Sequence, residues 1–140
     1  MVIYGGNKLK AITIKQPWAT LIAKGLKKYE FRTWNTKYRG DILIHAGKEI
    51  DHEVMKKYAH YKFDYPTGCF IAKARLTEVI TISEDFRKIL KKDNEEIYNG
   101  VVNTKWQGYG FKLEDVKIIK QITAKGQLGL WNYEGNDFNE

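Results

Sequence analysis

The sequence predicts an α+β fold, namely a small mixed β-barrel of five or six strands with two or three flanking helices. Three observations support this class. A chain of 140 residues has the length of one domain that buries its own core. Several short segments alternate apolar and polar residues with the period of two that is typical of half-buried strands. The helical segments between them do not follow the regular strand, helix, strand order of a doubly wound sheet.

The first expected elements are a strand at residues 10–14 and a short helix at residues 15–25. β-Branched residues dominate the strand and favour an extended backbone. In the helix, Pro17 suits the first turn, apolar residues follow from Trp18 at i, i+3 and i+4 spacing, and Gly25 ends it.

Two strands and a helix are expected next. Residues 29–34 alternate strictly, and a turn separates them from a strand at residues 41–46, which Gly47 and Lys48 close. From residue 50 to residue 61, apolar side chains recur on one helical face, which predicts a helix.

The second half of the chain begins with a long strand at residues 67–82, which we expect at the centre of the barrel. Ser83 offers an N-cap, with acidic residues in the first turn and Lys91 and Lys92 in the last, so a surface helix follows. Residues 94–107 show the least pattern, and we interpret them as a loop over the functional site.

The remaining strands are expected at residues 109–122, with a kink midway, and at residues 128–131. We therefore predict one domain at residues 10–133. A lead-in at residues 1–9 precedes it, and an acidic, mobile tail at residues 134–140 follows it.

Composition favours some functions and excludes others. A net charge of +7 and a pI of about 9.4 favour polyanionic partners, although many basic proteins bind nothing in particular. A single cysteine, Cys69, excludes an internal disulfide and fits a reducing compartment. No signal peptide or membrane-spanning segment is recognisable, so we expect a cytoplasmic protein, or a nuclear one in a eukaryote.

The segment from Gly25 to Trp34 holds the most constrained chemistry. In a strand of period two, Glu30 and Arg32 share one face, next to Trp34 and after Lys27. A carboxylate and a guanidinium side by side can hydrogen-bond a planar polar ligand while an aromatic ring stacks on it. The simpler interpretation is a solvated ion pair that contributes little. Lys27 lies on the opposite face of a regular strand, so it must enter the site from the preceding turn.

These residues resemble the ASCH domain family, a branch of the PUA-like superfamily of small β-barrels. The resemblance spans residues 10–133 and rests on four blocks in order: Gln16-Pro17-Trp18-Ala19, the G-x-K-x-x-E-x-R signature at Gly25, Lys27, Glu30 and Arg32, then Tyr38-Arg39-Gly40, and Lys125-Gly126-Gln127-Leu128-Gly129-Leu130-Trp131.

Our first hypothesis is a cleft that binds RNA or a modified nucleotide. Glu30 and Arg32 would read the polar edge of an unstacked base, and Trp18 or Trp34 would stack on it. Lys15, Lys27 and Lys48 would hold the phosphates. Trp18 is, alternatively, an ordinary core residue of its helix. We expect no metal and no cofactor. The expected ligand-binding residues are Lys15, Gln16, Trp18, Lys27, Glu30, Arg32, Trp34, His45 and Lys48.

The alternative hypothesis is an enzyme centred on Lys27 and Glu30. The resemblance implies an amidohydrolase that removes the acetyl group from N4-acetylcytidine, since one branch of the family does so with the signature lysine, a threonine and a downstream glutamate. Here Glu30 stands at the threonine position, and no downstream glutamate matches. A ribonuclease is the minor alternative, and a protein-interaction module is a third class. Zinc hydrolase, zinc deaminase, serine hydrolase and P-loop patterns are absent from the sequence.

Overall fold

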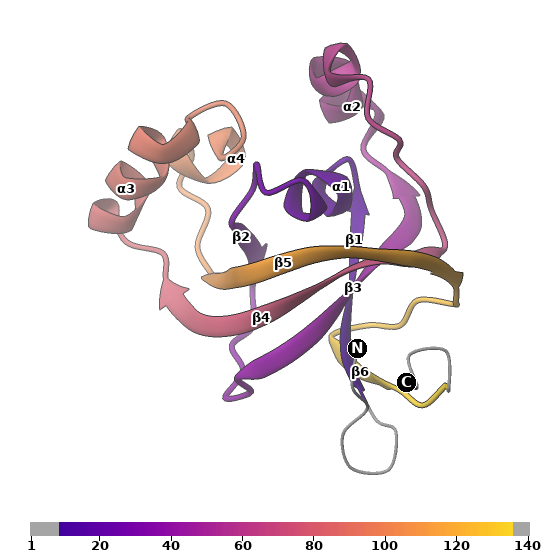
Figure 1. The fold of residues 1–140 in the computed structure, drawn as a ribbon. Helices are drawn as coiled ribbons and strands as arrows, with labels where there is room; N and C mark the ends of the chain where they lie inside the picture. Colours follow the sequence, from indigo (N-terminus) through magenta and orange to yellow (C-terminus); the bar gives the residue numbers. More distant parts are fainter. Residues whose placement is uncertain (1–8, 136–140) are drawn as a thin grey trace.

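The computed structural model describes residues 9–135, and Figure 1 shows one twisted sheet with helices above it. The sheet has six strands in the order β2-β5-β4-β3-β1-β6, and every pair is antiparallel except β1 with β3. The strands are β1 (Leu9–Gln16), β2 (Tyr29–Arg32), β3 (Gly40–Ile50), β4 (Cys69–Thr81), β5 (Tyr109–Thr123) and β6 (Leu130–Tyr133). The helices are α1 (Trp18–Ala23), α2 (His52–Tyr58), α3 (Glu84–Asn94) and α4 (Asn99–Val102), with a 3-10 turn at Ala59–Tyr61.

The mixed α+β architecture is confirmed, but the sheet is not a closed barrel. Within residues 9–135, β2 and β6 each pair with one strand, so the sheet has two open edges. One side chain bridges part of the gap between β2 and β1: Arg32 Nη2 donates to the Thr13 carbonyl of β1 at 2.8 Å. The closed barrel expected from the sequence is therefore not confirmed.

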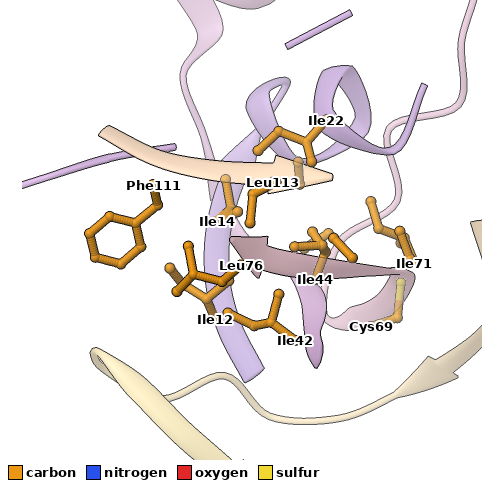
Figure 2. Close-up of a cluster of buried hydrophobic side chains, with 14 residues drawn as sticks. Ile12, Ile14, Ile22, Ile42, Ile44, Cys69, Ile71, Leu76, Phe111 and Leu113 are labelled. Atoms are coloured by element: carbon orange, nitrogen blue, oxygen red, sulfur yellow. The ribbon is translucent and has the colours of Figure 1, made fainter. Parts of the chain in front are cut away.

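The main core lies on the inner side of the curved sheet, where Figure 2 shows isoleucines of β1, β3 and β4 pointing toward one another. Ile12 and Ile14 of β1 face Ile42 and Ile44 of β3, and all four are almost fully buried. Ile22 brings α1 onto the same cluster. Burial of such side chains is the dominant stabilising term in a domain of this size.

The alternate residues of β1 and β3 lie on the other side of the sheet. Leu43 joins a small cluster there with Phe70 and Trp131, and Thr13 and His45 lie beside it. The strand period of two therefore separates a core face from a face that is free to carry a site.

Two expected boundaries differ from the structure. β3 continues past Gly47 to Ile50, because its parallel partner β1 pairs Gln16 with Ile50. The helix that follows is shorter than expected: it is capped by Asp51, whose carboxylate accepts from the Val54 amide.

The expected loop at residues 94–107 is also wrong in part. It contains α4, which lies beside α3 in Figure 1, and Tyr98, Val101 and Trp106 pack with α3 in a second apolar cluster. The Tyr98 and Trp106 rings in that cluster contact the Phe31 ring of β2. The helix α3 begins as predicted, with the Ser83 hydroxyl accepting from the Phe86 amide.

The predicted kink in β5 is confirmed. Asp115 has φ 52°, in the left-handed region, where the pairing of β5 with β4 shifts register. The expected lead-in at residues 1–9 falls mostly outside the described residues, as does most of the acidic tail predicted at residues 134–140.

Candidate functional site

Lys27, Glu30 and Arg32 form a buried cluster in the gap between β2 and β1. Lys27 Nζ donates to Glu30 Oε1 at 3.1 Å, and it also donates to the Tyr29 carbonyl. Arg32 donates from Nε and Nη2 to Glu30 Oε2 at 3.1 and 2.8 Å. Only 4% of Lys27 and 8% of Glu30 are exposed. The alternative interpretation of Glu30 and Arg32 as a solvated ion pair is therefore wrong, because the two side chains belong to a buried network whose guanidinium is fixed against Thr13.

The local sequence explains how Lys27 reaches this network. α1 ends at Ala23, and Gly25 takes φ +78°, which favours glycine and reverses the chain. The Leu26 and Lys27 amides then both donate to the Leu21 carbonyl. Lys27 consequently enters from the turn before β2, as the spacing requires.

The cluster lines a pocket of about 330 Å³. Its walls include the rings of Trp18 and Phe31, whose centroids lie 5.6 and 4.9 Å from Lys27 Nζ. Within the part of the chain that the structure describes, several polar groups of the cluster can still form hydrogen bonds to a ligand. They are the two N–H groups of Arg32 Nη1, one N–H of Lys27 and one lone pair of Glu30 Oε1.

Burial and mutual charge set the protonation of the cluster. Burial lowers the pKa of Lys27, with the Arg32 charge adding to this effect and Glu30 opposing it. Burial alone would raise the pKa of Glu30, but the charges of Lys27 and Arg32 and their hydrogen bonds outweigh it, so that pKa is lowered. Glu30 is therefore an anion at neutral pH, and Lys27 gives up its proton more readily than a surface lysine.

A second, larger pocket of about 450 Å³ adjoins the first, since Thr13, Lys15 and Arg32 line both. Its other side is the loop from Ala124 to Gly129. Positive charge dominates the lining, which contains Lys15, Arg32, Lys48 and Lys125 with one carboxylate, Glu49.

Thr13 and His45 hold that loop in place. The Thr13 hydroxyl accepts from the Gln127 amide at 3.3 Å and from Trp131 Nε1 at 3.0 Å. His45 Nε2 is 2.7 Å from the Ala124 carbonyl, to which it donates. Burial lowers the pKa of His45 against the opposing effect of this bond, so the ring is neutral near pH 7.

The structure gathers seven of the nine predicted ligand-binding residues around the two pockets. Gln16 and Trp34 are the exceptions. The Gln16 amide is buried and bonds Thr20 and Pro66, and Trp34 packs edge-on against Phe111 with ring centroids 5.2 Å apart. The residues that line the pockets are Lys15, Trp18, Lys27, Glu30, Arg32, His45 and Lys48, and their binding of a ligand stays a prediction.

Sequence reasoning missed Thr13, Phe31 and the loop at residues 124–129 as site residues. The glycines of that loop were a usable signal in the sequence, since glycines often mark close packing of the backbone. In the structure, an added Cβ at Gly126 would be 2.9 Å from the Thr13 side chain. The partnership of Thr13 with a loop more than a hundred residues away had no local signal.

Residues 9–135 contain neither a candidate metal cluster nor a candidate membrane-spanning helix. No group of three or more His, Cys, Asp or Glu side chains there could hold a metal ion. No helix in that range has the length and apolar character needed to cross a bilayer.

Comparison with known proteins adds the following. The family model described as "ASCH domain" matches residues 12–122. Activating signal cointegrator 1 is 32% identical in Homo sapiens and 33% identical in Mus musculus in an alignment of 82 residues that covers 50% of this chain. That match spans only 14% of either relative's length.

Solved structures agree in fold. The crystal structure of ASCH from Zymomonas mobilis has a TM-score of 0.56 and 18% identity, over 81% of this chain and 72% of that one. A point mutant of the same Zymomonas mobilis protein gives a TM-score of 0.55 and 18% identity, over 81% and 74% of the two chains. At this level of identity the likeness concerns the arrangement of strands and helices alone.

Proposed function

Since this chain belongs to the ASCH domain family, we propose that it binds RNA or a nucleotide with a modified base, with one unstacked base in the smaller pocket. The observation that supports this most is the fixed network of Lys27, Glu30 and Arg32, which lines that pocket with unused donors and one unused acceptor. A base out of its stack needs an aromatic surface and edge contacts, and this pocket offers both.

The roles of the predicted residues follow from exposure. Lys27 is too buried to serve as an ordinary phosphate contact, so its role is at the base edge. Trp18 and Phe31 are the rings available for contact with the base. Phosphates would be held in the larger pocket by Lys15, Lys48 and the uncommitted Nη1 of Arg32.

Fluorescence anisotropy with a labelled single-stranded RNA of random sequence tests the proposal. We expect binding that weakens as salt rises, because phosphate contacts release counterions. Arg32→Ala should weaken binding about tenfold or more, which is the range of one lost hydrogen bond to a charged group. Lys91→Ala is the matched control, since Lys91 is an exposed cation of α3 that lines neither pocket.

Two results would count against it. Wild-type protein that binds neither RNA nor any nucleotide removes the proposal. Affinity that does not change with salt removes the phosphate contacts. Circular dichroism of Arg32→Ala must accompany the assay, because Arg32 also bridges β2 and β1.

A second candidate function is hydrolysis of an acylated nucleoside, and one observation favours it. Lys27 is a buried lysine whose pKa is lowered, which is what a lysine general base requires. Neutral Lys27 would take a proton from water as that water attacks the acetyl carbon. The same proton would then pass to the departing amine as the C–N bond breaks, leaving acetate and the free base.

The assay is incubation with N4-acetylcytidine, followed by proton NMR for acetate and cytidine. If this candidate is right, wild type produces both and Lys27→Ala produces neither. Lys28→Ala should behave as wild type, because Lys28 points to Asp93 at 3.0 Å on the surface. An inactive wild type removes the candidate.

A further inference from the structure

We propose that the larger pocket is a second nucleotide subsite in which Leu128 packs against the base, so that the chain binds two or more linked nucleotides in preference to one. This rests on the proposed function and specifies the class of ligand. Three features of the pocket support it: its cations, the fixed loop at residues 124–129 and the position of Leu128.

The cations suit the phosphate that links two nucleotides. Arg32 lies where the pockets meet, and its Nη1 group has no partner within residues 9–135. Lys48 and Lys125 are exposed on the far side. Among residues 9–135, Glu49 is the one carboxylate of the lining, and it lies 3.4 Å from Lys15 Nζ, which partly neutralises it.

The loop that lines the pocket packs directly on β1 and is fixed there. An added Cβ at Gly126 would lie 2.9 Å from the Thr13 side chain, so only glycine allows this close packing. The loop is held firmly, because Ala124 is bonded to His45 and Gly68, and Gln127 is bonded to Thr13. A ligand would meet a preformed surface, and ordering that surface would cost little entropy on binding.

Leu128 is a large, exposed apolar side chain in the lining of the larger pocket. It is 98% exposed, compared with 58% for Ile89 and 59% for Ile118. An exposed leucine alone is common on protein surfaces. Leu128 differs because it lines a cation-rich pocket and projects from a loop that is fixed at both ends. Apolar side chains in such positions pack against base faces in other nucleic-acid sites.

The experiment compares competitors of one labelled random-sequence RNA at equal nucleotide concentration. The competitors are the four ribonucleoside monophosphates, a mixture of dinucleoside monophosphates, and an unlabelled RNA of about eight nucleotides. We expect wild type to prefer dinucleotides to mononucleotides by about tenfold. Leu128→Ala should reduce that preference about threefold or more and leave mononucleotide affinity unchanged. Ile118→Ala and Ile89→Ala are the matched controls for loss of an exposed apolar side chain.

The outcomes separate this inference from the proposed function. Equal affinity of wild type for mononucleotides and dinucleotides overturns the second subsite and leaves the base pocket standing. Equal loss of both affinities in Leu128→Ala also overturns it. Failure of every competitor and of the labelled RNA to bind removes the proposed function and this inference with it. Because Leu128 has almost no packed neighbours, an unchanged melting temperature should accompany the variant.

Discussion

The two pockets that meet at Arg32 use charge in different ways. In the smaller one, Lys27 and Arg32 are bound to Glu30, and little of the network faces water. In the larger one, Lys48 and Lys125 are exposed, and flexible side chains meet a loop fixed by its backbone. A fixed, desolvated network favours selectivity, whereas exposed cations favour affinity that depends on salt.

This difference predicts whether a substitution will change folding, ligand choice or ligand affinity. Changes in the smaller pocket should affect folding and ligand choice together, because the network also holds β2 against β1. Changes to the exposed side chains of the larger pocket should affect ligand affinity while the fold stays intact, whereas its loop glycines also support the fold. Three predictions test this division, in order of decreasing effect.

The largest effect is expected for Glu30→Ala. It leaves Lys27 and Arg32 close together without their shared anion, and breaking a buried pair in this way costs about 3–5 kcal/mol. Urea unfolding gives the free energy directly. The control is Glu53→Ala, which removes an exposed pair with Lys56 and should cost less than about 1 kcal/mol. Equal losses for the two variants would mean that the network is no more than a surface pair.

A second effect is expected in acid. The pKa of Glu30 is lowered in the folded protein from its ordinary value of 4.5. Ionised Glu30 therefore contributes its full stability at pH values above 4.5. That contribution is lost as pH falls below 4.5 toward the folded pKa, because the unfolded state then binds the proton more readily. In Glu30→Gln, the unfolding free energy should therefore depend less steeply on pH in this range. Parallel curves for wild type and variant would contradict the prediction.

The third effect compares two glycines. An added Cβ at Gly126 would lie 2.9 Å from the Thr13 side chain and 3.0 Å from His45, so Gly126→Ala should cost about 1–3 kcal/mol and displace the loop. Gly100 in α4 has open space around it, so Gly100→Ala should be neutral or stabilising by up to about 1 kcal/mol. Thermal unfolding distinguishes the two. RNA binding should fall in the first variant alone.

Local patterns predicted the parts of the site that lie on one element. The period of two placed Glu30 and Arg32 on one face of β2, and their ion pair of 2.8 Å agrees with it. The same reasoning required Lys27 to come from the turn. Ser83 was recognised as a cap because a cap depends on residues three positions away.

The parts that were missed depend on pairs far apart in the chain. β3 is longer than its own sequence suggested because β1 pairs with it in parallel as far as Ile50. The alternation of residues 29–34 placed Trp34 on the face of Glu30 and Arg32. In the structure its ring instead packs against Phe111 of β5, at the edge of the main core. Thr13 has an ordinary strand environment in sequence, and only the fold brings Arg32 and Gln127 to it. No periodicity carries such information.

The bond from Arg32 to Thr13 has one more consequence. β6 pairs with β1 only as far as Ile12, so beyond that point the free side of β1 has a guanidinium where a neighbouring strand would lie. A ligand in the smaller pocket would contact both β1 and β2 and hold the two strands together. Backbone amides of β1 beyond Ile12 and of β2 should then exchange with deuterium more slowly as the pocket fills. Amide exchange would thus report occupancy without a label on the occupant.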